Sequence, residues 1–231
     1  MEEGTRARVE LIIPALDEEG SIGRALAEIP EGLYDRVLVV DNGSTDGTAG
    51  VARAAGATVL REPRRGYGAA CLRGIAALDP ATAIVVFMDA DASDVPAEAA
   101  SLLEPILDGR ADLVIGSRAL GRSEAGSLTP QQRFGNRLAT ALIGLLYGHR
   151  YTDLGPFRAI RAASLRTLGM RDPGYGWTIE MQIKALKKGL RVAEVPVSYR
   201  RRIGRSKISG NLRASIAAGV KILWTVVRLA M

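Results

Sequence analysis

The chain has 231 residues, of which 47% are hydrophobic and 24% charged, and these proportions fit one α/β domain with a sizeable core. Its single cysteine, Cys71, excludes an internal disulfide and makes the reducing cytoplasm the expected compartment. The one histidine, His149, has no cysteine or second histidine with which to share a metal. Both residues are therefore interpreted as structural.

The net charge of +6 conceals a strong asymmetry between the two halves of the chain. Residues 1–110 carry a net −9, from 19 acidic and 10 basic side chains, whereas residues 111–231 carry +15, from 6 acidic and 21 basic side chains. One half can supply metal-binding acids, and the other can supply bases for phosphate or a face for anionic lipid. A nucleic-acid binder would gain nothing from an acidic half facing the same ligand.

The first ten residues, MEEGTRARVE, are polar and acidic and do not have the pattern of a signal peptide. No uncharged apolar run reaches the ~18–20 residues that a membrane-spanning helix needs. We therefore expect no membrane crossing by a simple helix.

Short apolar segments alternate with helical patterns over the first half of the chain. We expect strands over residues 9–14, 36–40, 57–60, 84–88 and 111–116. We expect helices over residues 17–29, 49–55, 68–77 and 97–107. This alternation is typical of an α/β fold with a doubly wound, mostly parallel sheet and helices on both faces.

The pattern changes in the second half. A polar loop over residues 118–133 precedes expected helices over 134–147 and 176–188, and a strand is expected over 191–198. A basic loop then leads to a C-terminal amphipathic helix. We predict one domain over residues 1–210 and treat residues 211–231 as an appendage.

Two carboxylates end the strand expected over residues 84–88. Asp89 and Asp91 are separated by one small residue and would lie at the carboxyl edge of the sheet, where open α/β folds bind ligands. Hard oxygen ligands suit Mg²⁺ or Mn²⁺, and such ions bridge carboxylates to phosphate oxygens. Taken alone, the motif is equally well a solvated surface turn.

A second strand end leads into Asp41 and the polar segment 42–48, which offers acceptors for a base or ribose, or a cap for the next helix. The glycine turn over residues 65–68 precedes a helix, where backbone can approach a ligand closely. The chain has no P-loop motif, and the absence of G-x-G-x-x-G after its first strand argues against a Rossmann dehydrogenase.

Taken together, PALDEE (14–19), VVDNGSTDGT (39–48), RGYGAA (65–70) and MDAD (88–91) resemble the motifs of family 2 glycosyltransferases with the GT-A fold. The ordered series continues through segments 116–118, 132–136, 153–158 and 195–207. It is similar to the branch that transfers mannose or glucose to dolichyl or polyprenyl phosphate. The resemblance extends from Val9 to about Gly210.

The resemblance implies roles for individual residues. The nucleotide sugar would be bound by Pro14, Leu16, Glu18, Asp41, Gly68 and Asp89. Asp89 and Asp91 would hold its diphosphate through Mg²⁺ or Mn²⁺. Donor or acceptor phosphate would be bound by Arg118, Arg133, Arg201 and Lys207.

Two departures from the family pattern concern this site. Asn42 stands where the family often has a second Asp, and Ala92-Ser93-Asp94 follows the metal motif where lipid-phosphate members often have Leu-Gln-His. A third metal ligand from the protein would be Ser93 or Asp94.

Three further features each have two interpretations. Glu180 is the best candidate for a base toward a hydroxyl acceptor, or it is an acid favoured by the helix dipole. The basic loop over residues 200–207 is a phosphate clamp or a solvated face. The helix over 211–231 lies on a membrane surface, or it packs on the domain or in a dimer. Trp177 is expected to be wall or core.

The sequence therefore predicts a cytoplasmic, metal-dependent, inverting enzyme in peripheral contact with the anionic inner face of a membrane. It would transfer a hexose from a donor of the GDP-mannose or UDP-glucose type to a lipid-linked phosphate such as polyprenyl phosphate. The alternatives are a soluble hydroxyl acceptor, a basic nucleic-acid-binding module and a non-catalytic sensor of sugar nucleotides. The motifs do not distinguish between the donor sugars.

Overall fold

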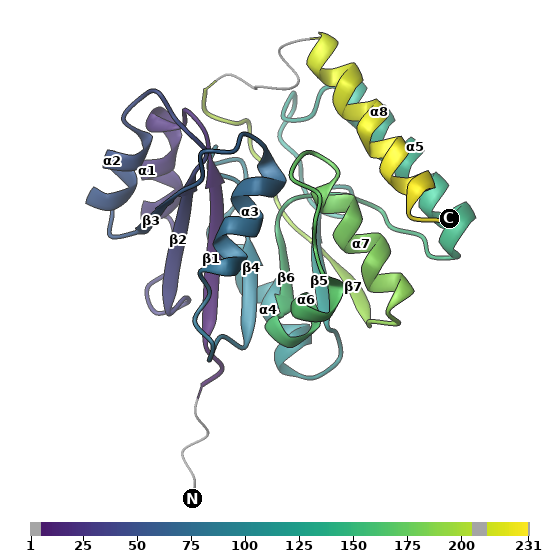
Figure 1. Ribbon diagram of the computed structural model, residues 1–231, viewed down its shortest axis with the longest axis horizontal. Helices are drawn as coiled ribbons and strands as arrows, with labels where there is room; N and C mark the ends of the chain where they lie inside the picture. Colours follow the sequence, from purple (N-terminus) through teal and green to yellow (C-terminus); the bar gives the residue numbers. More distant parts are fainter. Residues whose placement is uncertain (1–5, 205–211, 231) are drawn as a thin grey trace, which may run out of the picture.

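One seven-stranded sheet forms the centre of the computed structural model, which describes residues 6–204 and 212–230 (Figure 1). The strands are β1 (Val9–Ala15), β2 (Arg36–Asp41), β3 (Thr58–Arg61), β4 (Ile84–Phe87), β5 (Leu113–Ser117), β6 (Arg158–Arg161) and β7 (Val192–Pro196). Their order across the sheet is β3-β2-β1-β4-β6-β5-β7. Every pair is parallel except those of β6, which runs antiparallel to both β4 and β5.

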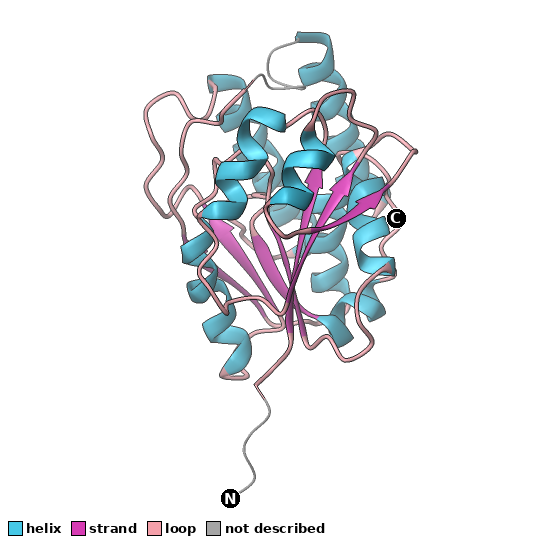
Figure 2. Cartoon of the chain, turned by 90° about the vertical axis from the view of Figure 1, so that its left-hand side faces the viewer, coloured by secondary structure: helices cyan, strands magenta, loops and turns pink. Residues whose placement is uncertain are grey.

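The helices cover both faces of this sheet (Figure 2). They are α1 (Glu19–Ala27), α2 (Thr48–Ala54), α3 (Tyr67–Ala76), the 3₁₀ turn η1 (Pro96–Glu98), α4 (Ala99–Leu107), α5 (Pro130–Tyr147), α6 (Ala162–Leu168), α7 (Trp177–Lys187) and α8 (Leu212–Arg228). Strand β1 shows how the alternation of side chains builds two core layers. Leu11 and Ile13 pack with residues of α1, α2 and α4, whereas Ile12 packs with residues of α3, α6 and α7.

Helices α5 and α8 lie side by side beyond α7 (Figure 1). Thr225 and Val226 of α8 are buried, and Val226 belongs to the same core layer as α7. The hydroxyl of Tyr147, the last residue of α5, donates to the Val226 carbonyl at 2.7 Å. One side of α8 is therefore packed on the protein while the other carries exposed apolar residues. The domain boundary at residue 210 stays a prediction.

The α/β, mostly parallel GT-A architecture is confirmed, and two elements were not predicted. Strand β6 has the sequence RAIR, so neither of its alternating faces is uniformly apolar, and α6 has only seven residues. Helix α5 begins at Pro130, four residues earlier than expected. Within the described ranges, the helices are all too short or too polar to cross a membrane.

Candidate active site

The carboxyl ends of β1, β2 and β4 meet at one edge of the sheet and carry acids. Asp41 is the last residue of β2, and Asp89 and Asp91 follow β4. The turn after β4 is tight, with φ of 59° at Ala92. The N–H and hydroxyl of Ser93 donate to Asp91 Oδ1 at 3.0 and 2.5 Å, so the Asp91 carboxylate is held in one orientation.

Three carboxylates crowd this turn. Asp94 is buried, and its Oδ2 accepts the Asp89 N–H at 3.2 Å. Burial and the charge of Asp91 raise the pKa of Asp89 to about 7. Burial and the two neighbouring carboxylates raise the pKa of Asp94 well above its usual value. In the described part of the chain, Oδ1 of Asp89 and Oδ1 of Asp94 have no hydrogen-bond partner.

This arrangement fits a divalent cation bound at Asp89 and Asp91, because a buried carboxylate oxygen without a partner is an unsatisfied acceptor. No three Asp, Glu, His or Cys side chains within residues 6–204 and 212–230 are arranged to hold a metal by themselves. Phosphate or water oxygens would complete the shell, as is usual for Mg²⁺. Ser93, predicted as a metal ligand, is buried, does not line the cavity and orients Asp91, and its contact with a cation stays a prediction.

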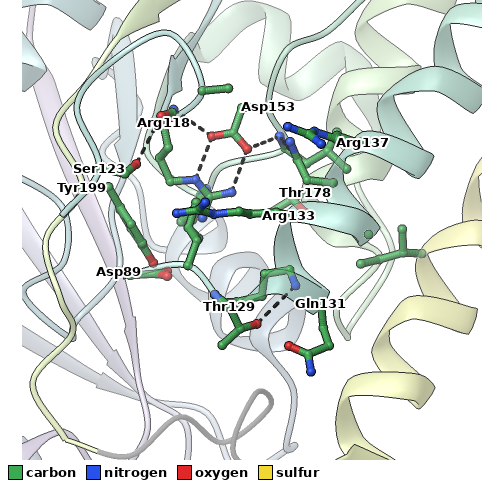
Figure 3. Close-up of a pocket in the computed structure, with 18 of the residues that line it drawn as sticks. Asp89, Arg118, Ser123, Thr129, Gln131, Arg133, Arg137, Asp153, Thr178 and Tyr199 are labelled. Atoms are coloured by element: carbon green, nitrogen blue, oxygen red, sulfur yellow. Dashed lines mark hydrogen bonds and ion pairs between the residues drawn. The ribbon is translucent and has the colours of Figure 1, made fainter. Parts of the chain in front are cut away.

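A cavity of about 800 Å³ opens beside these carboxylates (Figure 3). Its walls come from the segments after β5 and before β6, from α5, α7 and α8, and from residues 199–202. Its cationic lining residues are Arg118, Arg133, Arg137 and Arg202. Its acidic lining residues are Asp89, Asp91 and Asp153. The cavity is therefore suited to an anionic ligand.

Arg118 is fixed in the cavity wall by Asp153 (Figure 3). The pair is bidentate, with both side-chain contacts at 2.7 Å, and the Arg118 backbone N–H also donates to Asp153 at 2.8 Å. The guanidinium lies 5.0 Å from the centroid of the Tyr199 ring. Burial alone would raise the pKa of Asp153, but the charge and hydrogen bonds of Arg118 outweigh it and lower this pKa. Arg118 thus lines the cavity, and its predicted contact with phosphate stays a prediction.

Arg202, and not the predicted Arg201, reaches the acidic edge. Arg202 Nη2 lies 3.3 Å from Asp91 Oδ2 and 3.3 Å from Glu18 Oε1. The Arg201 Nε donates instead to the Ala125 carbonyl at 2.7 Å, and Arg201 does not line the cavity. The structure therefore places Arg202, and not Arg201, in the cavity wall beside Asp91.

The run Arg200-Arg201-Arg202 gave no signal for this choice, because three consecutive arginines offer the same charge and only their contacts with distant residues distinguish them. Arg200 pairs with Glu28 at 2.5 Å, away from the cavity. Lys207, the other predicted clamp residue, lies outside the described residues.

Arg133 and Arg137 line the cavity from α5, one turn apart. Both are exposed, and neither forms an ion pair with a described residue. The helix begins with a capping box: the Gln132 N–H donates to Thr129 Oγ1, and the Thr129 N–H donates to Gln132 Oε1. The T-x-x-Q pattern could have revealed this start. It would also have placed Arg137, which the sequence analysis missed, on the same helix as Arg133.

Four of the residues predicted to bind the nucleotide lie at the ends of β1 and β2, outside the 800 Å³ cavity. The Glu18 N–H donates to Thr48 Oγ1 at 2.7 Å, and the Ser44 N–H donates to Asp41 Oδ1 at 2.9 Å. The first bond joins the segments that follow the two strands, and the second holds the turn after β2. The predicted residues at this edge are Pro14, Leu16, Glu18 and Asp41. Their contacts with a nucleotide stay a prediction.

Asn42 has a local structural role that explains its difference from the family pattern. Its Nδ2 donates to the carbonyls of Glu62 and Arg64 at 3.1 and 2.8 Å, and its Oδ1 accepts the Gly66 N–H at 2.7 Å. An ionised carboxylate could not donate the first two bonds. Asn42 therefore holds the segment that leads into the glycine turn.

The glycine turn is closely approached by the chain itself. A Cβ on Gly68 would lie 2.0 Å from the Asp172 carbonyl oxygen, and one on Gly66, whose φ is 139°, would lie 2.1 Å from the Pro173 oxygen. The Gly68 N–H donates to Gly174 at 3.2 Å. These contacts leave no room for a side chain at either position, and the role of Gly68 at the nucleotide stays a prediction.

Glu180, predicted as a base or as an acid favoured by the helix dipole, does not face the cavity. Its side chain is buried and does not line the cavity. It accepts the backbone N–H groups of Arg171 and Asp172 and pairs with Lys184 at 2.8 Å. Trp177 is fully buried and is core, as expected.

The fold and site together place a cavity suited to an anionic, phosphate-like ligand at the carboxyl edge of a mostly parallel sheet. Residues 10–169 match the family model described as Glycosyl transferase family 2. The chain belongs to this family of enzymes.

Relatives and solved structures agree with this assignment. The chain is 41% identical over 224 residues to an uncharacterized glycosyltransferase of Mycobacterium tuberculosis, covering 95% of this chain and 97% of that protein. It is 31% identical over 218 residues to an undecaprenyl-phosphate mannosyltransferase of Micrococcus luteus, covering 89% of each. The structure resembles glucosyl-3-phosphoglycerate synthase of M. tuberculosis in complex with Mn²⁺, UDP and glucosyl-3-phosphoglycerate. That likeness has a TM-score of 0.78 and 27% identity and covers 97% of this chain and 80% of the other.

Proposed function

We propose that this glycosyltransferase moves a hexose from a nucleotide sugar to a phosphate carried by a lipid, and that the reaction depends on Mn²⁺ or Mg²⁺. The mannosyltransferase relative, which is named for a lipid phosphate, supports the acceptor class. The solved complex with Mn²⁺ and UDP supports the donor and the cation. The observation that carries the proposal is the charge of the cavity.

The cavity binds anions but offers no spare base. Among its described lining residues there is no histidine or glutamate, and Asp153 is bound to Arg118. Asp89 and Asp91 would face the cation, so no lining carboxylate is left to deprotonate a hydroxyl. A phosphate monoester is already ionised near neutral pH and needs no such base. Arginines are also the side chains best suited to bind its oxygens.

The transfer would be one in-line displacement. A phosphate oxygen of the acceptor attacks the anomeric carbon while the bond from that carbon to the diphosphate breaks, which inverts the configuration and releases the nucleoside diphosphate. A bound cation would neutralise the departing diphosphate. Arg202, 3.3 Å from Asp91, is positioned to add a second positive charge there. Arg133 and Arg137 would hold the acceptor phosphate on the side of α5.

A phosphorylated soluble acceptor is the second candidate, favoured by the likeness to glucosyl-3-phosphoglycerate synthase in complex with phosphoglyceric acid. Arg133 and Arg137 would suit its phosphate equally well. The candidates differ in the attacking atom, which is a phosphate oxygen for the lipid acceptor and a hydroxyl oxygen for a sugar-acid acceptor.

The test separates donor from acceptor. Binding of UDP-glucose, GDP-mannose and related donors is measured by calorimetry with Mn²⁺, and turnover is then measured with a short-chain polyprenyl phosphate and with 3-phosphoglycerate, both without membranes. We expect product from the polyprenyl phosphate only, and none in excess chelator. Product from phosphoglycerate alone would establish the second candidate. Absence of any donor binding would overturn the donor assignment.

A lipid acceptor requires contact with a membrane, and α5 and α8 offer a surface for it. On α5, Phe134 and Leu145 are 70% and 80% exposed, and on α8 Trp224 is 54% exposed. Neither helix contains an acidic residue, and both line the cavity. A second copy of this chain would bring like charges together, whereas anionic lipid complements them. The inner face of the membrane stays the predicted location.

Sedimentation with vesicles tests this surface. Wild-type protein should bind phosphatidylglycerol vesicles at low salt, bind less at high salt, and bind phosphatidylcholine vesicles weakly. Replacing Phe134, Leu145 and Trp224 together with Gln should reduce binding. Leu107→Gln, an exposed position at the end of α4, is the matched control. A folded wild-type protein that ignores anionic vesicles at low salt would instead assign these helices to a protein interface.

A further inference from the structure

An ion pair connects α8 to the loop over residues 171–176. The Asp172 side chain is 1% exposed, and Lys221 Nζ lies 3.0 Å from its Oδ2. Lys221 is the only cation within ion-pair distance of Asp172 in the described chain. A buried carboxylate that loses its counter-ion is strongly unfavourable. The position of α8 and the position of this loop are therefore linked.

Asp172 also shapes the loop from within. Its Oδ1 accepts the Gly174 N–H at 2.8 Å, and its own N–H donates to Glu180 Oε2 at 2.8 Å. Gly176 lies close to α8 as well, since a Cβ there would be 2.6 Å from Thr225 Oγ1. The loop is thus held by α7 on one side and by α8 on the other.

The loop in turn covers the start of α3. The N–H groups of Gly68 and Ala69 donate to Gly174 and Pro173 at 3.2 and 2.8 Å, and so they have partners that a helix start otherwise lacks. The Gly66 N–H, just before this helix, donates to Asn42 Oδ1 at 2.7 Å. A chain of direct contacts therefore runs from α8 to the carboxyl end of β2.

We propose that Lys221 and Asp172 are positioning residues for donor binding. Through loop 171–176 they fix the glycine turn and the end of β2, although neither residue is at the predicted nucleotide site. Helix α8 also lines the cavity through Gly219 and Ile222. The ion pair consequently couples the cavity wall formed by α8 to the glycine turn and the end of β2. Binding of a ligand at either place would change the affinity at the other by the same factor. This inference rests on the proposed nucleotide site and adds its dependence on α8.

The experiment measures the Kd of UDP and of GDP in the presence of Mn²⁺, and it needs no acceptor. Lys221→Met should raise the Kd of the nucleotide that binds by roughly 2- to 30-fold. Lys221→Arg should restore binding, because it keeps the charge. The double variant Asp172→Asn with Lys221→Met leaves no unpaired charge and keeps the acceptor for Gly174. It should fold, but its nucleotide Kd should remain higher than that of wild type, because the ion pair no longer joins the loop to α8.

Lys187→Met is the matched control. Lys187 Nζ donates to the Leu229 carbonyl at 2.7 Å, so this variant also loses a bond to the α8 region, but one without contact to loop 171–176. Its nucleotide Kd should stay within about twofold of wild type. If Lys221→Met and the double variant also stay within that range, the ion pair is only structural and the inference is overturned. If wild-type protein binds neither nucleotide, the proposed function fails first, and the two failures are thus distinguishable.

Discussion

The proposed donor side of the site contains Asp89, Asp91 and Asp94, and the proposed acceptor side contains Asp153 and Arg118. The carboxylates on these two sides differ in how their charge is balanced. On the donor side, Asp89 and Asp94 are crowded together, have raised pKa values, and each leave Oδ1 without a hydrogen-bond partner in the described chain. On the acceptor side, the buried Asp153 is bound bidentately by Arg118 and has a lowered pKa. The donor side thus has a charge deficit that a cation would fill, whereas the acceptor side is already assembled.

Removing an acid from the donor side should have the largest effect. Asp91→Asn should lower turnover on the order of 1,000-fold, because it weakens the proposed hold on the cation and the diphosphate. The matched control is Asp108→Asn at the exposed end of α4, whose pair with Arg110 contributes little. Steady-state rates with saturating Mn²⁺ provide the measurement. Undiminished turnover by a folded Asp91→Asn protein would mean that the acidic edge does not bind a catalytic cation.

Arg201 and Arg202 are adjacent in the chain and test whether the position of a guanidinium, and not only its charge, determines activity. Arg202→Ala should lower kcat/KM on the order of 100-fold, because Arg202 is the cation that pairs with Asp91 in the described part of the chain. Arg201→Ala should change it by no more than about threefold, since its guanidinium binds the Ala125 carbonyl away from the cavity. Equal losses in the two variants would show that the segment acts by its general charge and not by the position of Arg202.

Two glycines test how tightly the two sides are packed together. Gly68→Ala should lower the free energy of unfolding by about 1–3 kcal/mol, because the new Cβ would lie 2.0 Å from the Asp172 carbonyl oxygen. Gly50→Ala, in α2, meets no atom within 4 Å and should stabilise the protein by roughly 0.5–1 kcal/mol. Urea unfolding measures both. Equal stability of the two variants would mean that loop 171–176 yields to the added methyl group.

The donor side was largely predictable, because its signals are local. Asp41 and Asp89 directly follow apolar strands, and parallel strands bring their carboxyl ends to the same edge. Strands β4 and β5, which lie on either side of β6, were also predicted, because each is a local apolar run. Strand β6 was not, since Arg158 shares one of its faces with Ile160 and Arg161 shares the other with Ala159.

Other features of the site depend on contacts between distant segments, which a local pattern does not encode. Nothing near Gly68 in the sequence indicates that Asp172 will lie against it. The choice between Arg201 and Arg202 depends on which distant groups each guanidinium contacts. For Glu180, local chemistry offered a base or a helix-terminal acid, and the burial of its carboxylate against two backbone N–H groups decided for the structural role.

The pH dependence of metal binding is the mildest test of the contrast between Asp89 and Asp153. A proton on Asp89, whose pKa is raised to about 7, competes with the cation, so Mn²⁺ affinity should fall by about tenfold for each pH unit below 7. Asp153, with its lowered pKa, stays ionised throughout this range and should contribute nothing. Calorimetry between pH 5.5 and pH 8 measures the slope.

The raised pKa of Asp89 also makes the stability of the cation-free protein depend on pH. The folded pKa of Asp89 lies above the unfolded value of about 3.9, so the folded state binds the extra proton between these limits. The contribution of Asp89 to stability should therefore fall as pH rises from about 4 to about 7 and stay level above that. Asp89→Asn removes the titrating group, so its stability relative to wild type should increase over the same interval. If the difference in stability between the two proteins does not change with pH, another carboxylate titrates in this interval. The unbalanced charge of the donor side would then not lie mainly on Asp89.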